Sequence, residues 1–304
     1  MVSLSDLPDT TRDDAPTQLE IRLRRRARIN SAIRYGLLIL VGLVMIYPLI
    51  WLIGASFKTN SEMFSSAWFW PKEPTLDGYV KGWQTSTPYT FATFFINSMQ
   101  IVIPKVIGTA VSCTLVAYGF ARFEFPGKKV LFTILIATLL LPDVVTRIPQ
   151  YLLFRELGWL DTYLPLFAPS WLAGDAFFVF MVIQFLRAIP REMEEAAFID
   201  KASRFQALWH VILPQARGGI AVTVIFIFLN AWNEFLFAVQ LGGNTVRPVT
   251  VAMYNFVSVE QTLWAKLSAA ALVAMIPMIV IGIAAQRQIV KGLTVGAVKG
   301  GGRT

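Results

Sequence analysis

The sequence predicts an all-α integral membrane protein that crosses the bilayer six times. Its 304 residues are 55% hydrophobic and only 15% charged, and the mean hydropathy is +0.57. The apolar residues form blocks of about 20, which is the length that a helix needs to cross the hydrocarbon core. Lys and Arg are concentrated in alternate segments between these blocks, as expected when the cytoplasmic loops retain positive charge.

The net charge of +8 has the same explanation, so nucleic acid is not expected as a partner. Cys113 is the only cysteine and lies inside an apolar block, which excludes a disulfide or a cysteine metal cluster within the chain. The only histidine, His210, has no acid or cysteine at ligand spacing. We therefore expect no metal site.

Each expected span is an apolar block bounded by polar or basic residues. An arginine-rich arm precedes the first span, and a basic, glycine-rich tail follows the last. Pro142 and Pro149 lie in the third span, where they can loosen a helix at a gate. The six expected spans are residues 33–56, 91–118, 130–151, 164–186, 218–240 and 267–285.

The charge bias places both termini in the cytoplasm, because most of the 27 Lys and Arg then lie on that side. The expected domains are a cytoplasmic arm at 1–32, a transmembrane domain at 33–285 and a cytoplasmic tail at 286–304. The longest outer loop, residues 57–90, contains three Trp, a residue that favours membrane interfaces.

The cytoplasmic loop at 187–217 is polar and helical in pattern, which a connection between two spans does not require. Pro190 suits the first turn of a helix, and the acids that follow it suit the positive end of the helix dipole. Ser203 and Gln206 have the spacing of a capping box for a second helix, which Pro214 is expected to end. Its apolar stripe comprises Phe205, Leu208, Trp209 and Ile212. The loop is either a docking surface for a soluble partner or an ordinary interfacial helix.

Within this loop, Glu195-Ala196-Ala197, Asp200 and Leu213-Pro214 form a spaced motif. It is accompanied by Asn97-Ser98 and by the stretches 122–128 and 285–294. Together these residues resemble the EAA loop and flanking motifs of binding-protein-dependent ABC importer permeases of the carbohydrate (maltose-type) branch. The resemblance runs from about residue 35 to the C-terminus.

The resemblance implies the type I ABC importer permease architecture, in which this loop is the coupling helix pair seated in a cleft of an ATPase subunit. Glu194 and Glu195 would pair with basic residues of that subunit, and three aromatic side chains would fill its apolar groove. The residues implied to couple the two subunits are Glu194, Glu195, Ala196, Ala197, Phe198, Asp200, Lys201, Phe205, Trp209, Leu213 and Pro214.

Lys201 departs from the family pattern, which has glycine six residues after the glutamate. Glycine suits a bend with positive φ, a conformation that lysine adopts at a cost. Either the turn differs in this chain, or the coupling is weaker, or Lys201 is a natural variant or an engineered change.

Polar residues in a span are candidates for the transport path, since they cost several kcal/mol when they face lipid. In the fifth span four residues at i, i+3, i+4 and i+7 share one helical face, where an amide, a carboxylate and a ring suit a sugar. They serve either as a path or as hydrogen-bonding links between helices. The candidate path residues are Asn97, Asn230, Trp232, Asn233, Glu234 and Phe237.

Three further charges lie within the expected spans. Asp143 and Arg147 are at i, i+4 and are expected to pair with each other. Lys105 either extends to the interface, pairs with an acid of a partner permease, or meets an anionic substrate; of these we favour pairing.

The expected function is that of a permease subunit of an ATP-driven, binding-protein-dependent sugar importer in the bacterial inner membrane. Its expected partners are a second similar permease, an ATPase dimer, a periplasmic or extracellular solute-binding protein and membrane lipid. The spacing from Gly119 to Gly127-Lys128 does not form a phosphate loop. We therefore expect no enzyme activity and no cofactor here, with ATP and Mg²⁺ bound by the ATPase.

Other assignments remain open at this point. Polyols, glycerol phosphates or acidic sugars are alternative solutes for a permease of this kind. An ion-coupled secondary transporter predicts an ionisable relay near the membrane midplane. A membrane scaffold would tolerate loss of the polar face in the fifth span.

Overall fold

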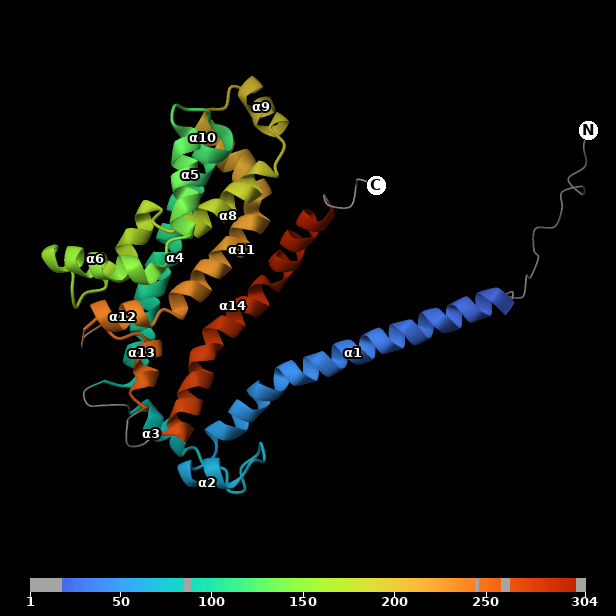
Figure 1. Ribbon diagram of the computed structural model, residues 1–304, viewed down its shortest axis with the longest axis vertical. Coiled ribbons are helices and arrows are strands. Elements are labelled where there is room, and N and C mark those ends of the chain that lie inside the picture. The colour runs from blue at the N-terminus through green and yellow to red at the C-terminus, as the bar shows by residue number, and fades with distance from the viewer. Residues whose placement is uncertain (1–17, 85–88, 244–245, 258–262, 299–304) are drawn as a thin grey trace, which may run out of the picture. The chain divides into compact units, whose positions relative to one another are not determined.

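The computed structural model describes residues 18–84, 89–243, 246–257 and 263–298, and all the regular elements described are helices (Figure 1). The chain divides into two compact units, Met1–Gly54 and Ala55–Thr304. The first unit is the larger part of α1 (Gln18–Ser56). Apolar side chains on all sides of α1, such as Leu38 and Val44, are exposed, as suits a helix surrounded by lipid or by another membrane subunit.

The second unit contains the remaining helices, three of which are long. In chain order these are α2 (Asn60–Ser65), α3 (Asp77–Trp83), α4 (Phe91–Arg122), α5 (Lys128–Leu139), α6 (Asp143–Glu156), α7 (Leu164–Phe167), the 3₁₀ helix η2 (Ala168–Leu172), α8 (Ala176–Arg187), α9 (Glu192–Ile199), α10 (Arg204–Ala207), the π helix η3 (Leu208–Ile212), α11 (Leu213–Trp232), α12 (Leu236–Leu241), α13 (Val249–Tyr254) and α14 (Trp264–Val298).

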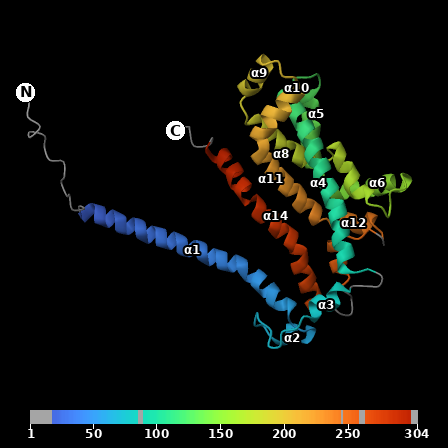
Figure 2. The same ribbon diagram turned by 180° about the vertical axis from the view of Figure 1, so that it is seen from behind.

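The core of the second unit is built on α4, α11 and α14. Helix α11 packs between the other two, and α8 packs against both α4 and α11 (Figures 1 and 2). The short helices α9 and α10 lie at one end of this bundle, and α2 and α3 lie at the other end beside the start of α14. The loops predicted at 187–217 and 57–90 are thus at opposite ends, as the predicted topology requires.

Two glycines allow close packing within the bundle. A Cβ at Gly108 of α4 would lie 2.4 Å from the Trp171 ring, and one at Gly219 of α11 would lie 2.3 Å from the Phe185 ring. Small residues let membrane helices approach closely where lipid supplies no hydrophobic driving force for their association. These contacts fix α4 against η2, and α11 against α8.

Among the described residues, five helices are long and apolar enough to cross a membrane, and the number becomes six if the bent pair α5–α6 is one span. These two helices form an angle of 102°. The third span predicted at 130–151 is therefore not one straight helix: Pro142 has no N–H to continue the α5 ladder and lies at the N-cap of α6. The all-helical membrane fold is confirmed, and the location of both termini stays a prediction.

The predicted fourth and fifth spans also differ from single helices. The segment 164–186 consists of α7, η2 and α8, with a break at Ala173 (φ +52°). The segment 218–240 was wrong at both ends, because the helical path begins at Arg204 and α11 ends at Trp232. Since Phe237 belongs to α12, the predicted face joining it to Asn230, Asn233 and Glu234 on one helix does not form.

The outer loop is folded rather than extended. Helix α3 packs against α14, and a Cβ at Gly78 would lie 2.8 Å from the Ala265 carbonyl oxygen. The Lys58 side chain is buried and donates hydrogen bonds to the carbonyl oxygens of Ser66 (3.1 Å) and Trp68 (2.6 Å). These bonds satisfy an ammonium group that would otherwise be costly to bury.

Candidate functional site

The loop at 187–217 forms a helical hairpin, α9–α10, at one end of the bundle. Helix α9 begins at Glu192, two residues after Pro190. The predicted capping box is confirmed: Ser203 Oγ accepts a hydrogen bond from Gln206 N (3.3 Å), and Gln206 Oε1 accepts one from Ser203 N (2.8 Å). This reciprocal pair fixes the start of α10.

Pro214 does not end the second helix, contrary to the prediction. Helix α10 continues through η3 into α11, and Pro214 lies in the first turn of α11. The π turn η3 widens the helix just before Pro214, and Leu213 N donates to the Leu208 carbonyl oxygen five residues back. The missing N–H of proline is therefore tolerated, and the hairpin is joined to α11 without a break.

The turn between α9 and α10 has a left-handed residue at Lys201, with φ of +61°. Lys201 N donates to the Phe198 carbonyl oxygen and Ala202 N donates to the Ala197 carbonyl oxygen, each at 3.0 Å. This is the Schellman arrangement, which usually has glycine at the left-handed position. The turn therefore keeps the shape that glycine favours, and Lys201 bears the strain.

Replacing Lys201 with glycine is expected to stabilise the protein by about 1 kcal/mol, because lysine is strained in the left-handed region and glycine is not. The apparent melting temperature of the purified protein in detergent measures this change. Lys201→Ala is the matched control, since it removes the same charge but keeps a Cβ. Equal melting temperatures for the two variants would contradict the strain at this turn.

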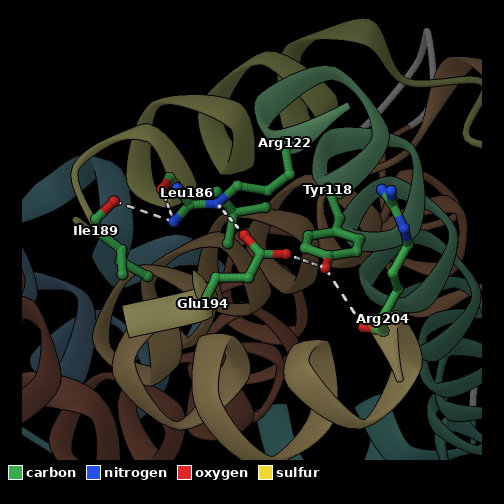
Figure 3. A network of polar contacts seen from close by, with 6 residues as sticks. All are labelled: Tyr118, Arg122, Leu186, Ile189, Glu194 and Arg204. Carbon is green, nitrogen blue, oxygen red and sulfur yellow. Dashed lines mark hydrogen bonds and ion pairs between the residues drawn. The ribbon is translucent and has the colours of Figure 1, made fainter. Parts of the chain in front are cut away.

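Glu194 is buried beneath the hairpin, with 6% of its surface exposed. Tyr118 Oη donates a 2.5 Å hydrogen bond to its Oε1, and Arg122 Nε lies 3.4 Å from its Oε2 (Figure 3). The expectation that Glu194 pairs with a basic residue of another subunit is therefore wrong, because its carboxylate is used within the chain. Glu195 is exposed, and it remains the candidate for that contact.

Arg122 connects three elements around this carboxylate. Its Nη2 donates hydrogen bonds of 3.0 Å to the carbonyl oxygens of Leu186 and Ile189, at the end of α8 and just after it (Figure 3). Its side chain is 4% exposed, so the guanidinium and the Glu194 carboxylate form a buried pair. The pair ties α9 to those ends of α4 and α8 that are predicted to face the cytoplasm.

The outer surface of the hairpin carries large exposed apolar side chains. The Phe205 and Trp209 rings are stacked, with centroids 6.2 Å apart and planes at 13°. Leu208 and Ile212, predicted in the same stripe, are instead buried in the core. We call the exposed set the docking patch; its members are Phe198 (39% exposed), Ile199 (81%), Phe205 (67%) and Trp209 (60%).

The sequence prediction did not include Ile199. The signal that could have identified it is its place as an apolar residue at the end of a short acidic helix. Glu195, Ala196 and Asp200 are exposed beside the docking patch, while Ala197 is half-buried. Leu213 is half-buried and Pro214 exposed. An exposed aromatic pair next to acidic side chains is typical of a protein contact surface rather than of lipid contact.

Two of the candidate path residues form links between helices. Asn97 Nδ2 donates to the Arg247 carbonyl oxygen (3.1 Å), and Tyr163 Oη donates to Asn97 Oδ1 (2.8 Å). The buried Trp232 indole donates from Nε1 to the Ala274 carbonyl oxygen of α14 (3.1 Å). These contacts match the alternative of interhelical hydrogen bonding for both residues.

The other candidates lie at the break between α11 and α12. Asn230 and Asn233 are exposed, and Asn233 Nδ2 donates to the Leu229 carbonyl oxygen (2.8 Å). Glu234 Oε1 accepts a hydrogen bond from Phe237 N (2.9 Å), so its carboxylate holds the first turn of α12. Asp143 was expected to pair with Arg147, and its side chain lies outside the part of the chain that the structure describes.

Residues 110–295, which include the hairpin, match the model of the family described as "Binding-protein-dependent transport system inner membrane component". The chain belongs to this family. It is therefore a membrane-embedded permease component of a transport system that depends on a binding protein. Membership favours the importer over the ion-coupled transporter and the scaffold.

Characterised relatives of this permease span most of its length. The diacetylchitobiose uptake system permease protein NgcG of Streptomyces coelicolor is 31% identical over 88% of each chain. The trehalose transport system permease protein SugB of Mycobacterium tuberculosis is 31% identical over 83% of this chain and 92% of its own. In permeases of this family ATP hydrolysis belongs to a separate subunit.

A solved structure has the same fold. It is a bacterial ABC transporter involved in the import of the acidic polysaccharide alginate, with a TM-score of 0.73 and 22% identity over 87% of this chain and 98% of that chain. At this level of identity the likeness establishes the arrangement of the helices and no more.

Proposed function

We propose that this permease forms half of the sugar path of an ATP-driven importer in the bacterial inner membrane, and that the α9–α10 hairpin receives the ATPase subunit. The observation that carries the proposal is the combination of an exposed docking patch with a buried anchor. Phe205 and Trp209 are free to enter a groove, while Glu194 holds the same hairpin to α4. The relatives named for sugar uptake support the substrate class.

The complete importer would contain a second permease, two ATPase subunits and a solute-binding protein. ATP and Mg²⁺ would bind to the ATPase subunits and not to this chain. The proposed contact residues are the docking patch together with Glu195, Asp200 and the exposed backbone turn at Lys201.

Closure of the ATPase dimer would displace the hairpin, and α11 would follow because η3 joins the two without a break. The buried pair of Glu194 and Arg122 would carry the same displacement to α4. Packed helices move as rigid bodies between discrete arrangements, so the path would open alternately to either side of the membrane.

The test is the charge reversal Glu195→Lys in the complete reconstituted importer. The expected result is loss of ATPase stimulation by the loaded binding protein, because a lysine would face the basic groove proposed for the partner. Glu73→Lys is the control, since it makes the same change at an exposed position of the outer loop. Unchanged stimulation in the Glu195 variant would contradict the proposed coupling surface.

A further inference from the structure

Three ionisable side chains lie together within the membrane-spanning part of the second unit. Lys105 is on α4, Arg147 is on α6, and Glu234 is at the break between α11 and α12. Charges at this depth are costly and persist where they face protein or a water-filled path. Glu234 lies near both cations, and the Asp175 carboxylate also lies near Lys105.

Arg147 is not satisfied by this carboxylate. Its Nη1 lies 3.9 Å from Glu234 Oε1, which is beyond hydrogen-bond distance, and that oxygen already accepts the bond from Phe237 N. No described residue accepts a hydrogen bond from the buried Nε and Nη1 of Arg147. Buried guanidinium donors without an acceptor are rare, because each carries a desolvation penalty.

Lys105 lines a small cavity next to the same carboxylate. The polar part of its lining is Ser98, Lys105 and Glu234, and the rest is apolar, including Ile101, Val102 and Leu166. The Lys105 ammonium is attracted by Glu234 and Asp175 and repelled by Arg147. The Asp175 carboxylate also accepts a hydrogen bond from Phe177 N (3.2 Å) at the start of α8. The Glu234 and Asp175 carboxylates thus each accept a hydrogen bond from a backbone N–H group and also lie near the cations.

We propose that Lys105 and Arg147 form a subsite for an anionic group of the transported solute, so that this permease carries an acidic carbohydrate. This inference rests on the proposed function and narrows its substrate class. The guanidinium offers donors at fixed angles that match a carboxylate, sulfonate or phosphate, and the ammonium supplies a second positive charge. Such a group would accept hydrogen bonds from the Arg147 donors that have no acceptor among the described residues.

The first test uses the wild-type importer with its binding protein in proteoliposomes. The probes are pairs of disaccharides that differ only in a carboxylate replacing a CH₂OH group, for example cellobiouronic acid and cellobiose. Accumulation and ATPase stimulation are expected with the acidic members alone. Transport of the neutral members, at rates equal to or above those of the acidic ones, would overturn the inference.

The binding protein also selects among solutes. Variants of this chain are therefore needed to show that its own residues contribute to the preference for acidic solutes. Lys105→Met and Arg147→Gln are each expected to raise the KM for acid uptake about 10-fold or more, the usual effect of losing one charge-assisted hydrogen bond. Lys105→Arg, which keeps the charge, is expected to retain most of the uptake. Arg155→Gln is the control, since Arg155 is an exposed cation on the same helix α6; it should leave the KM unchanged.

The failure of this inference is distinguishable from that of the proposed function. Unchanged KM in both cation variants, with coupling still lost in Glu195→Lys, would refute the subsite alone. Retained coupling in Glu195→Lys would refute the proposed function. If one cation variant does not assemble, the KM of the other still tests the subsite, and the wild-type comparison of acidic and neutral pairs tests the substrate class.

Discussion

Replacing Glu194 with alanine is expected to destabilise the protein by about 3–5 kcal/mol, because removal of one partner leaves a buried charge uncompensated. The charge in question is the Arg122 guanidinium, whose side chain is 4% exposed. Tyr118 would lose its acceptor at the same time. The apparent melting temperature in detergent should fall by on the order of 10 °C.

Glu195→Ala is the matched control for this change, since Glu195 is the next residue of the same helix and is exposed. Its effect on stability should stay within about 0.5 kcal/mol. The double variant Glu194→Leu with Arg122→Met should recover much of the loss, because both charges are then removed together. Equal melting temperatures for the two alanine variants would show that the Glu194 pair does not hold the hairpin.

Truncation of the docking patch is expected to abolish recruitment of the ATPase subunit. Phe205→Ala and Trp209→Ala should each weaken its binding by about 2 kcal/mol or more, roughly 30-fold, as for central aromatic residues of other interfaces. Titration of the ATPase subunit onto the permease complex in nanodiscs measures this affinity. The melting temperature should change little, because both rings are more than half exposed.

Trp68→Ala is the control for the patch. Trp68 is 66% exposed, similar to Trp209, but it lies between α2 and α3, the helices at the other end of the bundle. Its loss should leave ATPase binding unchanged. Equal affinities for the Trp68 and Trp209 variants would contradict the assignment of this surface.

Sequence patterns predicted the helices better than their ends. Length and hydropathy located the long apolar segments, and the spacing of Ser203 and Gln206 predicted a cap that the structure has. The sequence left open whether the turn at Lys201 keeps the positive φ that glycine favours, and the structure has a φ of +61° there. The break after Trp232 was not predicted, since Asn233 and Glu234 carry no breaker such as Gly or Pro.

The roles of Glu194 and Glu195 could not be separated from sequence for a different reason. Adjacent residues on a helix point about 100° apart, so one of two neighbouring acids faces inward and the other outward. Which of the two acids faces inward depends on the rotation of α9 about its axis. Tyr118 and Arg122 set this rotation, and each lies more than 70 positions away from Glu194 in the sequence. The contact between Arg147 and Glu234, at the break between α11 and α12, likewise joins residues that are far apart in the sequence.

The continuous helix from the hairpin into α11 also acts as a lever. The 20 residues of α11 span about 30 Å, so a tilt of about 10° at the hairpin end would move the far end by about 5 Å if the helix stays straight. That far end is Trp232, hydrogen-bonded to α14, and the break immediately beyond it carries Glu234. A small rotation at the hairpin would thereby produce a larger displacement near Glu234, whose side chain is half-buried.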